Sequence, residues 1–284
     1  MQVIHAIFGS PNDEEKILPG LVKATRDLGV EVRVHYASAD NTPQKVADLV
    51  AKLKDEKARV VISGAGLSNV LTGVVKAAMP FHVVHIGVPI YDSSFSGLTA
   101  LLSTAEKPPM NPVLCVGVNN TYAAVNIAHR FLQGLKDVVI YHNEDKSEAR
   151  RIGMNELRKV FDELGMLYKV SKLSELQQDA VIVNPFDYTS LDSVDKISRG
   201  GRGVQVGVSC AFIHEHPVQY KHILDTTYAT GIVSSEGYLN AVMMAALLTQ
   251  NMDVLEKLSV KKMRKHTDLT AHSGLIVQGG EVAR

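Results

Sequence analysis

A chain of 284 residues is long enough for one large domain or for two of ordinary size. Hydrophobic residues make up 45% and charged residues 21%, and the formal net charge is zero, so bulk electrostatics indicates neither a nucleic-acid-binding nor a membrane-surface protein. No apolar run approaches the roughly 18 residues of a membrane span and no signal peptide is evident, so we expect a cytoplasmic protein. Cys115 and Cys210 lie in apolar runs and are expected to be buried free thiols.

Short apolar runs in the first half of the chain alternate with segments of helical period. Strands are expected at residues 3–8, 30–36, 58–62, 81–86 and 113–118. Each of these strands ends in small, polar, glycine or proline residues. Strands that alternate with helices predict a doubly wound parallel α/β sheet. Because the carboxyl ends of parallel strands meet at one edge of a sheet, we expect the strand ends to converge on one ligand site.

A glycine-rich loop at residues 63–73 follows the third expected strand and leads into a segment that is compatible with a helix. Its glycines allow a ligand to approach the main chain, and the free N–H groups at a helix start favour an anion. A plain tight turn is the alternative interpretation. We take a backbone site that binds a ligand as the working hypothesis, and we expect the other strand ends to be arranged around this loop.

The pattern of the first half starts again at about residue 137. Residues 180–185 parallel residues 59–64, and residues 205–208 parallel residues 85–88. This indicates a diverged tandem duplication. We expect units at residues 1–136 and 137–260, followed by a tail at 261–284 that is first basic and then glycine-rich. The second unit lacks the glycine-rich loop, so we expect it to supply a sheet and an interface rather than a second full site.

Three short motifs stand at successive strand ends of the first half. They comprise Gly9, Ser10 and Asp13; Ser38, Ala39, Thr42 and Pro43; and Gly64, Gly66, Leu71 and Gly73. In order and spacing, residues 3–135 resemble the family of AIR carboxylases and N5-carboxyaminoimidazole ribonucleotide mutases, which are enzymes of purine biosynthesis. The resemblance implies tandem flavodoxin-like, three-layer α/β/α units, the second of them degenerate. It also implies that residues 97–113 form a long loop that closes over a nucleotide.

The chain departs from the family pattern at positions that carry chemistry. The catalytic histidine of the family falls at Asp40, its phosphate-facing basic residue at Asn41, and the loop histidine of the mutase branch at Val70. The pair Ser68-Asn69 is similar to the loop of the CO2-using carboxylase branch. In the family the histidine moves a proton at an imidazole carbon while a carboxylate is added or moved. An aspartate could replace it only where burial raises the pKa of the carboxyl group.

The resemblance implies an enzyme, either a carboxylase (a lyase) or a mutase (an isomerase), with Asp40 at the catalytic position. The expected substrate-binding residues are Gly9, Ser10, Asn12, Asp13, Ser38, Asn41, Gly64, Ala65, Gly66, Ser68, Asn69, Leu71 and Ser103. For the polar residues among them, helix caps, turns and surface hydroxyl groups are the alternatives.

The expected ligand is a phosphoribosyl aminoimidazole nucleotide, with CO2 or bicarbonate as a second candidate substrate. No cofactor, metal, nucleic acid or membrane is expected as a partner. The His214-Glu215-His216 run could place two imidazoles on one face of a strand, but no third ligand is evident. A homo-oligomer, namely a tetramer of tandem chains, is expected by analogy with the octamers of the family. Two alternatives stay open: a carboxylase of another nucleotide, of the pyridinium mononucleotide type, and a non-catalytic nucleotide-binding or scaffold protein.

Overall fold

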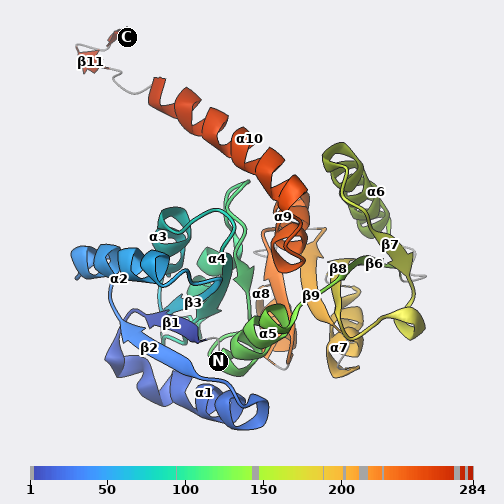
Figure 1. Ribbon diagram of the computed structural model, residues 1–284, viewed down its shortest axis with the longest axis horizontal. Coiled ribbons are helices and arrows are strands. Elements are labelled where there is room, and N and C mark those ends of the chain that lie inside the picture. The colour runs from blue at the N-terminus through green and yellow to red at the C-terminus, as the bar shows by residue number, and fades with distance from the viewer. Residues whose placement is uncertain are drawn as a thin grey trace.

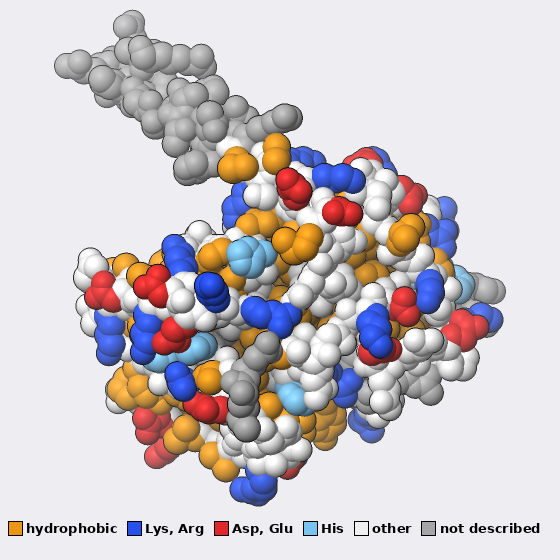
Figure 2. Space-filling model, viewed as in Figure 1, with side chains coloured by type: hydrophobic (Ala, Val, Ile, Leu, Met, Phe, Trp, Pro, Cys, Tyr) orange, Lys and Arg blue, Asp and Glu red, His pale blue; other side chains and the backbone are white. Residues whose placement is uncertain are grey.

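The computed structural model describes residues 3–93, 95–142, 147–187, 189–200, 203–210, 217–225, 227–271, 276–278 and 281–283. These residues form one ten-stranded sheet in the order β2-β1-β3-β4-β5-β10-β9-β8-β6-β7, and a separate hairpin of β11 (Ile276–Gln278) and β12 (Glu281–Ala283) (Figure 1). Among the described residues, no helix is both long and apolar enough to cross a bilayer. Figure 2 shows acidic and basic side chains interspersed over the viewed face, as the zero net charge suggests.

The first half is a doubly wound unit whose strands take the order 2-1-3-4-5, as expected for the α/β class. The strands are Ile4–Phe8 (β1), Val32–Tyr36 (β2), Val60–Ala65 (β3), Val84–Pro89 (β4) and Leu114–Cys115 (β5). The helices are Pro11–Asp13 (η1, a 3-10 turn), Glu14–Leu28 (α1), Pro43–Asp55 (α2), Val70–Ala78 (α3), Leu98–Ala105 (α4) and Thr121–Gln133 (α5). Helix α1 ends at Gly29, which takes the left-handed conformation with φ 65°, a backbone state that glycine adopts without strain.

The second half repeats the strand order of the first, read from its own outer edge. Its strands are Asp137–Tyr141 (β6), Lys169–Ser171 (β7), Ala180–Phe186 (β8), Val204–Ser209 (β9) and Thr230–Val233 (β10). Its helices are Glu148–Leu164 (α6), Leu173–Glu175 (η2, a 3-10 turn), Leu191–Arg199 (α7), Pro217–Asp225 (α8), Tyr238–Leu248 (α9) and Met252–Ala271 (α10). The repeated order supports the tandem duplication, which stays a prediction. Helix α10 runs through residue 261, so the boundary expected there falls inside a helix that projects from the body (Figure 1).

The two halves join through their last strands, which run in opposite directions. Cys115 of β5 pairs antiparallel with Ile232 of β10, whereas every other neighbouring pair recorded in the sheet is parallel. The carboxyl ends of the first-half strands therefore lie at one edge of the sheet, and those of the second half lie at the opposite edge. The loops that follow the first-half strands thus border the amino ends of the second-half strands. The carboxyl ends of the strands of the two halves therefore do not meet at one site.

Helices cover both faces of the sheet. Successive residues of each strand point to opposite faces, so alternate side chains pack in the hydrophobic cores on the two sides. Helices α1, α5, α6, α9 and α10 bury apolar side chains in the larger core. Helices α2 and α3 pack on the other face of the first half, and α4, α7 and α8 pack on that face across the junction. Each fully buried aliphatic side chain contributes about 1.5–3 kcal/mol by leaving water. Within the described part of the chain, Cys115 and Cys210 are buried and free, as predicted.

Two expectations about the fourth strand and the segment after it are wrong. Residues 80–83 form a turn in which Val83 N–H donates to the carbonyl of Pro80, so β4 begins at Val84 and continues through Pro89, beyond its expected end. The expected closing loop contains α4, because Ala100, Leu101 and two further residues at helical spacing form a buried face.

Candidate ligand site at the carboxyl edge of the first half

Backbone hydrogen bonds hold the motif-bearing strand ends side by side. Gly9 N–H donates to the carbonyl of Gly64 at 3.0 Å, and Ala37 N–H donates to the carbonyl of Phe8 at 3.0 Å. Ile90 N–H extends the row by donating to the carbonyl of Ala65 at 3.0 Å. The structure therefore brings together, along one edge, the turns at residues 38–42, 9–13 and 64–69 and the segment that follows β4.

The turn after β1 is fixed by a cap and by a lysine that the sequence did not single out. Ser10 Oγ accepts from Asn12 N–H at 3.1 Å and so caps η1. Asp13 Oδ1 accepts from Lys16 Nζ at 2.8 Å, and the same Nζ donates to the carbonyl of Tyr91 at 3.0 Å. Lys16 thus ties the first turn to the segment after β4. The only signal in the sequence is the spacing of Asp13 and Lys16, which places both on one helical face.

The turn after β2 is a closed set of hydrogen bonds with the catalytic candidate at its tip. Ser38 Oγ accepts from Asn41 N–H at 3.1 Å, and Ser38 N–H donates to Thr42 Oγ1 at 2.9 Å. Asp40 and Asn41 are both exposed. The protein by itself therefore leaves the Asp40 carboxylate open to solvent. Its catalytic role stays a prediction.

The two glycines at the start of the glycine-rich loop have different functions in the fold. A Cβ at Gly64 would lie 2.3 Å from the carbonyl oxygen of Val88, so Gly64 is needed for β3 to pack against β4. A Cβ at Gly66 would meet nothing nearer than the carbonyl oxygen of Ile90 at 3.7 Å. Ala65 is half-buried and Ser68 is exposed. Gly66 and Ser68 therefore offer accessible surface to a ligand, whereas Gly64 has a packing role.

The side chains of three other expected binding residues are engaged inside the protein. Asn69 is buried, donates from Nδ2 to Thr104 Oγ1 at 2.5 Å, and accepts from the hydroxyl of Thr72 at 2.8 Å, so that it caps α3 and links it to α4. Leu71 is buried in the core under α2 and α3. Ser103 lies on α4, where its hydroxyl donates to a backbone carbonyl of the same helix. These placements indicate capping and packing, and a binding role for the three residues stays a prediction.

We expect Asn69→Ala to lower the free energy of unfolding by about 1–3 kcal/mol, because the substitution removes a helix cap and two buried hydrogen bonds, to the hydroxyl groups of Thr72 and Thr104. Urea unfolding followed by circular dichroism measures this change. Ser68→Ala is the matched control, since Ser68 is exposed and precedes Asn69 in the same loop. An unfolding midpoint for Asn69→Ala equal to that of Ser68→Ala would show that the amide does not support the fold.

A buried polar network lies behind the glycine-rich loop. Ser63 Oγ is 2.7 Å from His85 Nε2 and donates to Thr72 Oγ1 at 3.2 Å. His85 is fully buried, burial lowers its pKa well below the usual value, and its Nδ1 has no partner among the residues that the structure describes. Lys76 on α3 is also buried, and its Nζ donates to the carbonyl of Val83 at 3.1 Å. The sequence did not predict this pair of buried basic groups.

Metal ligands do not cluster in the part of the chain that the structure describes, where no group of three histidine, cysteine or acidic side chains could hold an ion. The His214-Glu215-His216 run lies outside the described residues.

The fold and the edge loops together define the class of this protein. It is a doubly wound α/β protein with a candidate ligand site at the carboxyl edge of its first strands. The family described as AIR carboxylase matches residues 3–150, just over half of the chain. The chain therefore belongs to the AIR carboxylase family. The match ends within α6, so most of the second half lies beyond it.

Two relatives in sequence agree with this assignment. The N5-carboxyaminoimidazole ribonucleotide mutase of Methanocaldococcus jannaschii is 40% identical over 135 residues, which span 48% of this chain and 81% of the relative. The phosphoribosylaminoimidazole carboxylase of Saccharomyces cerevisiae is 31% identical over 130 residues, which span 46% of this chain and 22% of the relative. The crystal structure of Treponema denticola PurE aligns with a TM-score of 0.41 at 21% identity, covering 47% of this chain and 81% of that chain.

Proposed function

We propose that this protein is an enzyme of purine biosynthesis that adds or moves a carboxylate on an aminoimidazole ribonucleotide. One observation carries the proposal: the three motifs shared with the family stand side by side at one sheet edge, within the segment that matches the family. Open α/β sheets bind their ligands at this edge. The names of the relatives, a mutase and a carboxylase that act on such nucleotides, give the substrate class.

The binding mode that we propose places the phosphate of the nucleotide near the turn after β1. The helical segment that begins there points the positive end of its dipole toward this turn, and this end favours an anion. Lys16 is partly exposed and supplies a positive charge at the same turn. Asn41, in the neighbouring turn after β2, has no charge with which to replace the basic residue of the family. The base of the nucleotide would lie against the backbone at Gly66 and Ser68, where the loop is open.

The proposed chemistry is a proton exchange coupled to carboxylation. In the carboxylase reaction, a ring carbon of the imidazole forms a C–C bond to the carbon of CO2 and gives up its proton. In the mutase reaction, the C–N bond to the carboxylate breaks, the same C–C bond forms, and the ring proton passes to the amine. Asp40 stands at the position of the family histidine and would accept the ring proton, once the bound nucleotide has removed water from this exposed turn.

The exposure of Asp40 favours one second candidate, a non-catalytic nucleotide-binding protein. A protein of this kind would keep the binding loops without an acid-base residue. The pyridinium mononucleotide alternative gains no comparable support. The resemblance to that type implies a cysteine in the closing loop, whereas residues 99–112 contain none. Cys115 is a buried thiol whose pKa is raised by burial.

Turnover and binding assays distinguish the two candidates. We expect the protein to interconvert aminoimidazole ribonucleotide, bicarbonate and the carboxylated nucleotides, with products identified by chromatography. Asp40→Asn should lower kcat by at least about a hundredfold, the usual size of a general acid-base contribution, and should leave calorimetric affinity nearly unchanged. Asp55→Asn, an exposed aspartate at the end of α2, is the matched control. Binding without turnover would favour the non-catalytic candidate, and absence of both would contradict the purine assignment.

We also propose self-association. Three apolar side chains in and just before the first turns of α3 are exposed: Leu67 to 62%, Val70 to 45% and Val74 to 41%. Light scattering on the purified protein tests this proposal, since a monomer mass would contradict it.

A further inference from the structure

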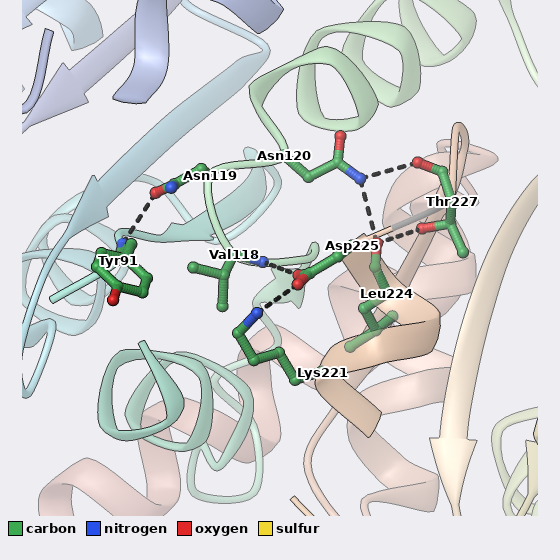
Figure 3. Close-up of polar contacts among 8 residues, drawn as sticks. All are labelled: Tyr91, Val118, Asn119, Asn120, Lys221, Leu224, Asp225 and Thr227. Carbon is green, nitrogen blue, oxygen red and sulfur yellow. Dashed lines mark hydrogen bonds and ion pairs between the residues drawn. The ribbon is translucent and has the colours of Figure 1, made fainter. Parts of the chain in front are cut away.

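We propose that the second half of the chain holds the ligand site of the first half in shape, with Asp225 as the positioning residue. This inference rests on the proposed function only for the identity of the ligand. Figure 3 shows the junction where the loop after β5 meets the end of α8. The proposed positioning role gives the second half a function that neither the family match nor the relatives assign.

Asp225 anchors the loop after β5 across the boundary between the halves. Its Oδ1 accepts from Val118 N–H at 2.7 Å, and its Oδ2 is 2.5 Å from Lys221 Nζ on the same helix (Figure 3). The ion pair restricts the rotation of the carboxylate, so Lys221 orients the acceptor. A charged acceptor makes a stronger hydrogen bond to a backbone N–H than a neutral one does.

The same loop makes a second attachment to the second half. Asn120 Nδ2 donates to the carbonyl of Leu224 at 3.1 Å and to the carbonyl of Thr227 at 2.8 Å (Figure 3). Gly117 permits this close approach, because a Cβ there would lie 2.4 Å from the carbonyl oxygen of Leu224. The loop is therefore attached on both sides of Asn119.

Asn119 connects the attached loop to the candidate site. It adopts a left-handed backbone conformation with φ 58°, and its Oδ1 accepts from Tyr91 N–H at 2.9 Å (Figure 3). The carbonyl of Tyr91 in turn accepts from Lys16 Nζ, which is paired with Asp13. A continuous series of hydrogen bonds thus leads from Asp225 to the turn where we place the phosphate. Loosening its first member should loosen the position of Lys16.

The opposite edge of the sheet holds a matching contact that serves as an internal control. There Glu106 of the first half accepts from Ser235 N–H at 3.2 Å, in the loop that follows β10. Each half thus contributes one carboxylate that accepts a backbone N–H from the loop after the last strand of the other half. Asp225 borders the candidate site, whereas Glu106 borders the carboxyl edge of the second half. Truncating Asp225 removes the hydrogen bond to Val118, and truncating Glu106 removes those from the N–H and the hydroxyl of Ser235. Only Asp225→Ala should affect the first site.

Hydrogen exchange measured by mass spectrometry tests the positioning without any assumption about the ligand. In the full-length protein, Asp225→Ala should speed amide exchange at Val118 and Tyr91, whereas Glu106→Ala should do so only around Ser235. Asp225→Asn keeps an acceptor oxygen and should restore most of the protection. Unchanged exchange at Val118 and Tyr91 in Asp225→Ala, or no rescue by Asp225→Asn, would overturn the inference.

Calorimetry with aminoimidazole ribonucleotide then tests the consequence for the site. Asp225→Ala should weaken binding roughly five- to tenfold and raise KM with little change in kcat, while Glu106→Ala should bind like the wild type. Loss of protection with unaltered affinity would overturn the connection to the ligand site. If the wild type does not bind this nucleotide, the proposed function fails while the exchange result still decides the positioning. If Asp225→Ala does not fold, Lys221→Met replaces it, and the same loop amides should then exchange faster.

Discussion

Lys76→Met is expected to make the protein more stable at neutral pH, although it removes a buried hydrogen bond to the carbonyl of Val83. Lys76 lies on α3 and is 2% exposed. Burial, and to a lesser extent the positive charge of Lys262, lower the pKa of Lys76 from 10.5 to about 7. Folding at pH 7 or below therefore either confines an ammonium group in the interior or removes its proton, and both cost free energy.

The sign of the pH dependence follows from the protons bound in each state. Between pH 7 and 10.5 the unfolded chain retains a proton at Lys76 that the folded protein has lost, so the stability of the wild type rises with pH through this window. A shift from 10.5 to about 7 corresponds to an upper limit of about 5 kcal/mol. Methionine has a similar length and no charge, but it leaves the carbonyl of Val83 without its donor, which costs about 1–3 kcal/mol.

The net expectation is a gain of about 2–4 kcal/mol at pH 6.5 that vanishes or reverses by pH 10.5. Urea unfolding of the wild type and the variant at both pH values gives this difference, and other titrating groups cancel in the comparison. Lys54→Met is the control, because Lys54 is exposed on α2 and should show no such window. Equal differences in unfolding free energy at the two pH values would mean that Lys76 is not the group that titrates.

Alanine at Gly64 and alanine at Gly66 are expected to have opposite effects, although the two positions lie in one loop. The methyl group of Gly64→Ala would lie 2.3 Å from the carbonyl oxygen of Val88 and 3.2 Å from the ring of Phe8. These neighbours belong to adjacent strands and cannot move without disturbing the sheet. We expect the unfolding free energy to fall by about 3 kcal/mol or more.

Gly66→Ala should keep the fold and lose the ligand. The added methyl group meets nothing within 3.7 Å and reduces the freedom of the unfolded chain, so stability should stay constant or rise by up to about 1 kcal/mol. Because the methyl group points into open space beside the proposed base, nucleotide affinity should fall by at least about tenfold. Thermal unfolding and calorimetry on the two variants separate these effects. Wild-type affinity in Gly66→Ala would remove this loop from the site, and wild-type stability in Gly64→Ala would mean that β3 and β4 can adjust.

Local features of the sequence were sufficient to predict the class of fold. These features are apolar runs of strand length, segments of helical period and the glycine that ends α1. Each of them depends only on the backbone conformation of a few neighbouring residues. The same features placed the three motifs at strand ends, and parallel strands in one sheet necessarily bring such ends to one edge. Candidate contacts at Ser10, Ser38 and Gly66 therefore followed from the sequence.

The tertiary structure decided which of the candidate side chains are free to meet a ligand. Asn69 and Leu71 look like neighbours of Ser68 in the sequence, yet they are buried in capping and packing contacts. The burial of Lys76 and the contact of Lys16 with Tyr91 depend on elements far apart in the chain. The antiparallel pairing of β5 with β10 is equally non-local: it sends the strand ends of the two halves to opposite edges and brings Asp225 to Val118. Periodicity records how a segment folds on itself, whereas strand direction between halves and the burial of single side chains are set by long-range packing.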